Sequence, residues 1–436
     1  MEFPAADDLE ALIDRPTYPS VASVRYEPET ETLEDPLATT RTELEQLPLS
    51  GLDAGATIAV GVGSRGIHDI DEIVAETVAF LDGRGFDPVL VPAMGSHGGA
   101  TPAGQLEILE TLGITEERIG VPIDARMEAD PVSEVEVGGT TASVYVARAA
   151  LEADAVMAIN RVKPHTNFTG RLESGLCKML TVGLGKQRGA QAFHSTALAE
   201  GYVPTLEAMI EAVRESVSLL GGLALVENFY EETGVVEAVP GESLEEREPA
   251  LLEVAREEMA TLPFEDLDLL VVDELGKEIS GAGMDTNVIG RYRVLNAPDP
   301  ETPAIDLIYA RGLTEGTKGN GNGIGLADIA RRAAIEQLDL QKTYANALTS
   351  GSLAKAKLPP VAPTDELALR VALNALGGDD PETVRLAWIE NTTDLAEFRV
   401  SEALLESLPD EATVLERERL AFDEGTATFE PLERFP

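Results

Sequence analysis

Strand-like and helix-like patterns of apolar residues alternate through the first 230 residues of the chain. Short apolar runs predict buried strands at 56–63, 87–94, 155–162 and 222–229, with a hairpin at 135–147 around Gly138-Gly139. Amphipathic periodicity predicts helices at 69–84, 101–112 and 204–218. Asp69 and Thr101 stand where capping side chains are expected. This alternation predicts an α/β domain with a largely parallel sheet.

An acidic, helical connection at 241–262 separates this region from a second alternating one. In this second region the apolar pattern predicts strands at 266–274, 305–310 and 384–390 and helices near 324–337 and 364–377. Residues 396–436 predict a helix and strands that could pack on either domain. We therefore expect two α/β domains with mainly parallel sheets and an interdomain cleft. The N-terminal domain would be 1–262, which 396–436 could complete, and 263–395 would close the cleft.

The charge of the chain excludes several classes of partner. Asp and Glu number 78 against 33 Lys and Arg, a net charge of −45. Such a surface repels the phosphates of nucleic acids and anionic membranes, so neither is an expected partner. Because the acidic residues are spread along the whole chain, we expect a halophilic protein. Its unfolding midpoint should then rise with added KCl.

The remaining composition predicts a folded protein of the cytoplasm. Hydrophobic residues make up 44% of the chain, enough for a packed core. No run of 18 apolar residues occurs and the first residues are acidic, so neither a membrane span nor a signal peptide is expected. The single Cys177 cannot form an intrachain disulfide, which suits a reducing compartment.

Three of the four histidines lie in glycine-rich or proline-marked loops. They are His97 in G-S-H-G-G, His165 in V-K-P-H-T-N and His194 in A-F-H-S-T. Histidine exchanges protons near neutral pH and binds metals as a neutral ring. His97 could also cap a helix, and His165 could be a solvated loop residue. Because Arg65, His97 and His165 each follow a predicted strand, they could converge at the carboxyl edge of one sheet.

Lysine is scarce but concentrated near these histidines. The chain has eight lysines, which leaves 33 − 8 = 25 arginines, and three of the eight fall within 163–186: Lys163, Lys178 and Lys186. Lys178 stands in an apolar stretch, where burial would lower the pKa of its amine and make it nucleophilic. A lysine that extends from a helix to solvent is the alternative. No Cys and His array with zinc spacing is present.

Together these residues resemble the nickel-dependent lactate racemase family. An arginine after the first strand, a histidine in a glycine-containing loop, a P-H motif, a glycine-preceded lysine and a histidine 16 residues later are typical of that family. Here they are Arg65, His97, His165, Lys178 and His194. The resemblance covers about Arg65 to His194 and continues more weakly into G-M-D-T-N-V-I-G-R.

The resemblance implies a cofactor. It would be a nickel-pincer nucleotide, a pyridinium mononucleotide with two sulfur donors, attached covalently to Lys178. Lys186 would also contact this cofactor. Nickel would take its protein ligand from His194, which suits a metal that accepts imidazole and receives three donors from the cofactor.

The resemblance also implies a reaction, the inversion of C2 of a 2-hydroxy acid by a racemase or epimerase. His97 and His165 would be opposed acid/bases at the 2-hydroxyl while hydride passes between C2 and the cofactor. Arg65 would hold the substrate carboxylate. Arg291, Arg293 and Lys277 are the candidates for a further contact with the substrate.

The chain departs from the family pattern at R-L-E-S-G-L-C-K, where the lactate enzyme has a G-G-R-K type sequence. We therefore expect a 2-hydroxy acid as substrate rather than lactate by name. Enzymes of cofactor synthesis are expected partners, and a homo-oligomer stays open. Two alternatives remain: a hydro-lyase or metal-assisted isomerase without the pincer cofactor, and a non-catalytic protein that binds a pyridine-nucleotide derivative.

Overall fold

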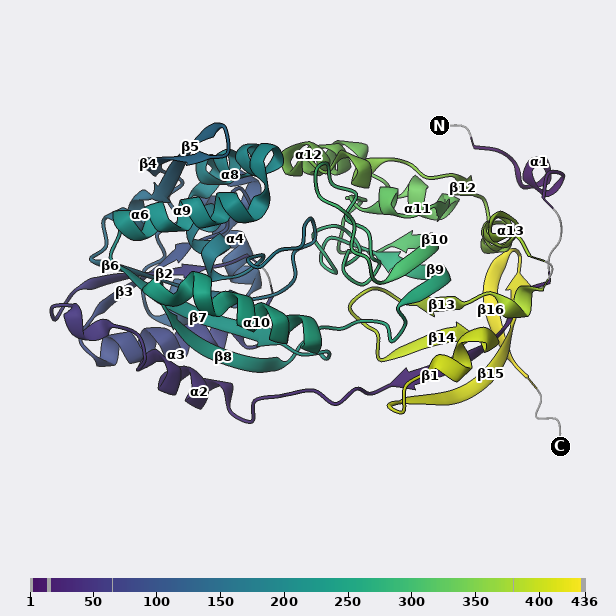
Figure 1. Cartoon of the computed structure of the whole chain (residues 1–436), viewed down its shortest axis with the longest axis horizontal. Coiled ribbons are helices and arrows are strands. Elements are labelled where there is room, and N and C mark those ends of the chain that lie inside the picture. The colour runs from purple at the N-terminus through teal and green to yellow at the C-terminus, as the bar shows by residue number, and fades with distance from the viewer. Residues whose placement is uncertain (1–2, 14–16, 65, 379, 433–436) are drawn as a thin grey trace. The chain divides into compact units, whose positions relative to one another are not determined.

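The computed structural model describes residues 3–13, 17–64, 66–378 and 380–432. They form two compact α/β units, each with its own main sheet (Figure 1). Unit 1 contains the chain up to Glu29, residues 166–168 and the chain from Ala260 onward. Unit 2 contains Thr30–His165 and Thr169–Met259. In the part of the chain described, no helix is long and apolar enough to cross a membrane.

Unit 2 is built on a five-stranded sheet of order β3-β2-β6-β7-β8. Its strands are β2 (Thr57–Val62), β3 (Asp87–Pro92), β6 (Ala155–Arg161), β7 (Leu219–Glu227) and β8 (Thr233–Pro240). The first four are parallel, and β8 pairs antiparallel with β7. The four strands predicted for this region are confirmed, whereas β8 was not predicted.

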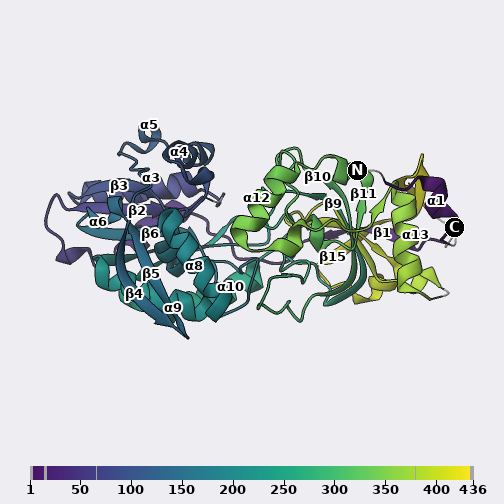
Figure 2. The same ribbon diagram turned by 90° about the horizontal axis from the view of Figure 1, so that it is seen from above.

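Helices cover both faces of this sheet. Alternate residues of β2 (Ile58, Val60 and Val62) are buried in one core with α2 (Pro36–Leu44) and α3 (Ile70–Gly83). Figure 1 shows α8 (Lys186–Glu200) and α9 (Tyr202–Ser216) on the opposite side. The remaining longer elements are α4 (Pro102–Thr111), α10 (Leu244–Glu258) and the hairpin β4 (Ala129–Val137) and β5 (Thr140–Ala147). The hairpin packs on α8 and α9 (Figure 2).

The two predicted helix caps have different outcomes. The Thr101 side chain accepts a hydrogen bond from the backbone N–H of Gly104 at 3.1 Å, which confirms the cap of α4. Asp69 does precede α3, but its φ is 55° and its side chain makes no capping hydrogen bond. The left-handed backbone at Asp69 turns the chain into the helix without the bond expected of a capping aspartate.

Unit 1 contains a nine-stranded sheet that is parallel in one half and antiparallel in the other. The parallel half is β12 (Val361–Ala362), β11 (Ile329–Arg331), β10 (Ala304–Leu313), β9 (Asp266–Leu275) and β13 (Leu386–Ile389). The antiparallel half continues from β13 with β14 (Glu397–Ser401), β1 (Ser20–Tyr26), β15 (Ala412–Asp423) and β16 (Thr426–Pro431). The expectation of a mainly parallel sheet therefore holds for only part of this unit.

The N-terminal strand and the last 41 residues differ most from the predicted domain boundaries. β1 pairs with β14 and β15, where Val21, Ala22 and Val24 are buried. The N-terminal segment thus belongs to unit 1 and not to the predicted domain 1–262. Residues 396–436 complete the same unit, because their strands form the antiparallel half of its sheet.

The helices of unit 1 are α1 (Ala6–Glu10), α11 (Arg332–Glu336), α12 (Leu340–Ser350) and α13 (Asp365–Leu376). α13 confirms the predicted helix at 364–377. The helix predicted near 324–337 is wrong over much of its length, because Ile329 pairs with Tyr309 as part of β11. Pairing within the sheet outweighs the local helical pattern there.

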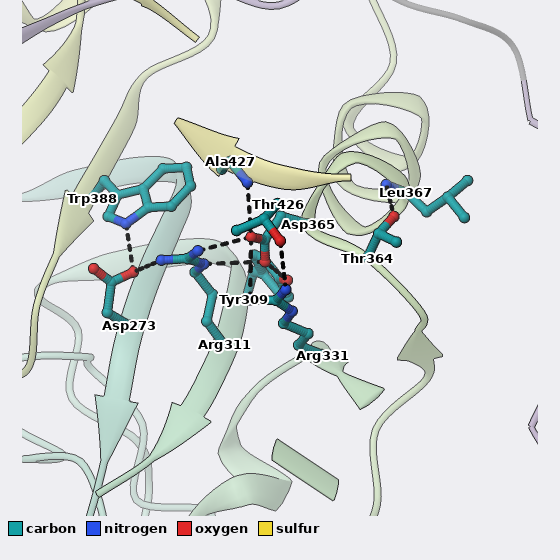
Figure 3. A network of polar contacts seen from close by, with 10 residues as sticks. All are labelled: Asp273, Tyr309, Arg311, Arg331, Thr364, Asp365, Leu367, Trp388, Thr426 and Ala427. Carbon is teal, nitrogen blue, oxygen red and sulfur yellow. Dashed lines mark hydrogen bonds and ion pairs between the residues drawn. The ribbon is translucent and has the colours of Figure 1, made fainter. Parts of the chain in front are cut away.

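A buried ionic network connects α13 to the sheet of unit 1 (Figure 3). The fully buried carboxylate of Asp365 accepts hydrogen bonds from Arg311 Nη2 at 2.7 Å and Tyr309 Oη at 2.6 Å. Arg311 also donates to Asp273 at 2.5 Å and lies over the Trp388 ring at 5.0 Å. Arg311 is therefore neutralised by two carboxylates, and the charges hold the start of α13 on β10.

Candidate active site

The candidate site lies in unit 2, where the carboxyl ends of β3, β2 and β6 are neighbours in the parallel sheet. His97 follows β3, Ser64 follows β2, and His165 follows β6. Ligands of open α/β sheets bind beyond such ends. Arg65, the residue predicted to hold a substrate carboxylate, lies outside the described residues.

The loop that carries His97 is exposed at its tip and tightly folded at its base. The Ser64 hydroxyl and His97 Nδ1 are 2.5 Å apart, so a residue of the loop after β2 orients the ring. Gly98 has φ +66°, and a Cβ there would lie 2.4 Å from the backbone of Gly104. A glycine is therefore required where this loop meets α4.

The loop that carries His165 is held by a carboxylate that sequence reasoning missed. His165 is buried, and its backbone N–H donates to Glu173 Oε2 at 2.5 Å. The other carboxylate oxygen accepts from Gly170 N at 2.8 Å, and Arg256 forms an ion pair with Glu173. Burial raises the pKa of Glu173. The P-H motif gave no signal for this support, because Glu173 follows His165 by a full loop.

Lys178 stands at the end of α7 (Leu176–Lys178), which continues into a π-helical turn, Met179–Gly183, and then α8. π-Helical turns occur often at functional sites. The Gly183 carbonyl accepts from Gly95 N at 3.1 Å, and a Cβ on Gly183 would lie 2.5 Å from Ala93 O. The turn after Lys178 therefore packs closely on the loop of His97.

His194 lies on α8 near Lys178. Burial, followed by the positive charge of Lys178, lowers the pKa of His194 to about 4. The ring is thus neutral at pH 7, the form that can bind a metal. The distance between ring centroids is 5.4 Å for Phe193 and His194, 6.1 Å for Phe193 and Tyr202, and 6.3 Å for Tyr202 and His165. This aromatic series connects His194 to the loop of His165.

A second buried carboxylate supports the turn of Lys178. Glu248 on α10 is 1% exposed, and its Oε2 accepts from Cys177 N at 2.9 Å. A Cβ on Gly175 would lie 2.4 Å from this carboxyl group, so the contact requires a glycine. Burial raises the pKa of Glu248 to about 7 and that of the Cys177 thiol well above its ordinary value.

Two residues predicted to bind the cofactor or the substrate are buried and hydrogen-bonded to other groups of the protein. Lys186, expected at the cofactor, has no exposed surface, and its Nζ donates to Pro92 O at 2.7 Å and to Gln105 Oε1 at 3.1 Å. Arg291, expected at the substrate, is buried in unit 1, where its guanidinium donates to three carbonyls and to Asp328. Burial and these contacts engage both charged groups in the structure, and a contact with cofactor or substrate stays a prediction for each.

The other candidates lie near the surface. Lys277 is an exposed residue of the loop after β9, and its substrate contact stays a prediction. The His68 backbone N–H donates to Glu227 Oε1 at 2.7 Å, and its half-exposed ring lies 3.4 Å from Asp69.

In the described ranges, no group of three or more His, Cys, Asp or Glu is arranged to hold a metal ion.

One lysine of unit 1 was not singled out from the sequence. Lys355 is 1% exposed and donates to Thr166 O at 2.9 Å and to Asn167 Oδ1 at 2.7 Å. Thr286 Oγ1 donates to the same Thr166 carbonyl at 3.0 Å. Burial lowers the pKa of Lys355 to about 8, while Asp285 and Asp299 oppose that change. Unit 1 thus holds the residues that directly follow His165.

Comparisons with known proteins point to the same part of the chain. A model described as a domain of unknown function, DUF362, matches residues 69–253, which is less than half of the chain. The match contains His97, His165, Lys178 and His194. A comparison with curated protein sequences gave no significant match.

Two solved structures are similar to this chain. The structure of the lactate racemase apoprotein from Thermoanaerobacterium thermosaccharolyticum has 16% identity and a TM-score of 0.50, with 85% of this chain and 94% of that chain covered. The fold is lactate racemase-like. A structural-genomics protein from Thermotoga maritima has 16% identity and a TM-score of 0.49, with 84% of this chain and 90% of that chain covered.

Proposed function

We propose that the protein is a racemase or epimerase that inverts C2 of a 2-hydroxy acid, with a nickel-pincer nucleotide attached to Lys178. The observation that carries the proposal is the closeness of Lys178 and His194 in the unit whose strand-end loops bear His97 and His165. The lactate racemase-like fold supports the same reaction class.

The residues present fit the proposed cofactor. Lys178 is partly exposed, and its amine is the group proposed to carry the cofactor. His194 is neutral at pH 7 and can donate a lone pair to nickel, a metal that accepts imidazole. When bound, the cofactor would supply a hydride acceptor and donor for C2 of the substrate. Gly63 lies against the turn that follows Lys178. A Cβ at position 63 would lie 2.8 Å from Met179 Cε, so a glycine there leaves room for the Met179 side chain.

His97 and His165 would move the proton of the 2-hydroxyl. An enzyme that inverts a carbon needs an acid/base for each configuration of the substrate. The Ser64 hydroxyl lies 2.5 Å from His97 Nδ1 and orients the ring for this role. His165 is held at its backbone by Glu173, so its ring extends from a rigid loop. Arg65 remains the predicted partner of the substrate carboxylate.

The experiment is co-expression with the enzymes that make the cofactor, followed by intact-mass and nickel analysis. We expect a mass adduct on Lys178 and racemisation of at least one compound in a panel of 2-hydroxy acids, measured by chiral chromatography. The adduct should be absent from Lys178→Arg and present in Lys342→Arg, a control at an exposed lysine. A wild-type protein without an adduct contradicts the proposal. Turnover that survives Lys178→Arg would favour an isomerase or hydro-lyase without the cofactor.

A further inference from the structure

Gln105 and Lys186 form a buried polar pair under the His97 loop. Neither side chain has exposed surface. Lys186 Nζ lies 3.1 Å from Gln105 Oε1 and 2.7 Å from Pro92 O, the last residue of β3. The pair therefore lies between the start of α8 and the strand from which the His97 loop emerges.

The chemistry of lysine determines how the Gln105 amide is oriented. An ammonium can only donate hydrogen bonds, so the amide must turn its oxygen toward Lys186 and its nitrogen away. That nitrogen donates to Gly95 O at 3.1 Å and, at 3.5 Å, to His97 O. Lys186 thus directs Gln105 toward two backbone carbonyls of the loop that carries His97.

The buried charge is costly for a purely structural contact. Within the described part of the chain, the hydrogen-bond acceptors of Lys186 are a carbonyl and an amide, which are both neutral. Burial lowers the pKa of Lys186 to about 8, and only Asp124 opposes that change at longer range. Lys186 also has φ +52°, a strained conformation for a residue other than glycine. Cost and strain of this kind persist where the placement of a group matters.

We infer that Gln105 and Lys186 are positioning residues, which set the His97 loop against the helix that carries His194. Lys186 is the first residue of α8, and His194 follows it by two turns of the same helix. One side chain therefore connects the backbone of the His97 loop to the His194 helix. The effect on turnover rests on the proposed function, whereas the effect on the location of His97 does not.

The test is Gln105→Glu in the full chain, since a carboxylate still accepts from Lys186 but cannot donate to Gly95 O. The four histidines give four Cε1–H signals in an NMR spectrum, which single His→Gln variants assign. We expect the His97 signal to move in Gln105→Glu while the His68 and His165 signals stay. We also expect kcat to fall about 10- to 100-fold, with KM within about 2-fold of wild type. The control is Glu107→Gln, an exposed position on α4.

Each outcome decides the inference. A His97 signal that stays in place in Gln105→Glu overturns it, as does a displaced signal with unchanged kcat. If Gln105→Glu does not fold, Gln105→Met, which removes both contacts at similar volume, is judged by the same signals. If the wild type acts on no 2-hydroxy acid but the His97 signal moves, the positioning stands and the proposed function fails.

Discussion

Two sites in the molecule, one in each unit, bury charge in different ways. In unit 1, the buried carboxylate of Asp365 meets Arg311, which a second carboxylate, Asp273, also neutralises (Figure 3). In unit 2, Lys186 is equally buried but bonds to neutral acceptors, and its pKa is lowered to about 8. The first arrangement resembles a structural ion pair. The second occurs next to the candidate active site, where perturbed pKa values are concentrated.

This difference teaches how to separate structural from functional charges in this fold. A buried charge that faces its counter-charge should matter for stability and little for chemistry. A buried group whose environment shifts its pKa without a counter-charge should matter for chemistry or make stability depend on pH. The following substitutions test that division, from the largest expected effect to the smallest.

The largest effect is expected at Lys178. Lys178→Ala removes the only amine proposed to hold the cofactor, so the mass adduct and the racemisation should both disappear. Intact-mass spectrometry and chiral chromatography of the co-expressed protein measure this. Retention of the adduct in Lys178→Ala would mean that another residue carries it.

Substitution of the two proposed acid/bases should come next. His97→Gln and His165→Gln should each lower kcat by about 10²- to 10⁴-fold, the usual contribution of general acid/base catalysis. The adduct mass should stay at the wild-type value, because neither side chain is proposed to hold the cofactor. A variant with kcat within about 3-fold of wild type would remove that histidine from the mechanism.

In unit 1 the effect should be on stability. Arg311→Met leaves the Asp365 carboxylate buried without its main counter-charge, so the free energy of unfolding should fall by about 3 to 5 kcal/mol. Turnover per folded molecule should not change. The control is Arg419→Met, which removes an exposed pair with Glu430 and should cost less than about 1 kcal/mol. Equal losses in the two variants would contradict a structural role for the buried network.

Glu248 tests a buried acid of unit 2 through pH. Its folded pKa, about 7, lies above the ordinary 4.5, so the fold favours the protonated form. The stabilisation is therefore complete below pH 4.5 and is lost as the pH rises to 7. The loss should be on the order of 3 kcal/mol. Urea unfolding at pH 4.5 and 7.5 should show this loss in wild type and not in Glu248→Gln. The same pH dependence in both proteins would contradict it.

The smallest effect concerns His194. Burial is the larger cause of its lowered pKa and the Lys178 charge the smaller. Lys178→Met should therefore raise the His194 pKa from about 4 only part of the way to 6.5. An NMR titration of the His194 ring in the cofactor-free protein measures it. A return to 6.5 would show that charge, and not burial, keeps the ring neutral.

The strongly periodic parts of the chain were predictable from sequence. The parallel strands of unit 2 are continuous apolar runs, and the helix at 101–112 has a capping threonine. β1 was not predicted, because its S-V-A-S-V-R-Y pattern is short and its strand structure depends on pairing with β14 and β15. β11 was predicted as helix for the same reason, since parallel pairing with β10 decides its structure.

The candidate site was predictable where glycine, proline and histidine occur together in loops. The residues that support it were not. Gln105 and Glu173 lie on a helix and in a loop whose sequences carry no signal of what they touch. The cluster of lysines was visible, but sequence could not distinguish Lys178, which is partly exposed, from Lys186, which is completely buried. Only packing separates the two.

The position of β1 has a consequence for synthesis of the protein. Arg25 on β1 pairs with Glu397 on β14, which follows it by 372 residues. At about 5 to 20 residues per second, the ribosome needs roughly 20 to 75 s to make that partner. Unit 2 is complete well before then, whereas β1 must wait with both edges unpaired. The newly made chain therefore has a long interval in which this strand can aggregate or bind a chaperone.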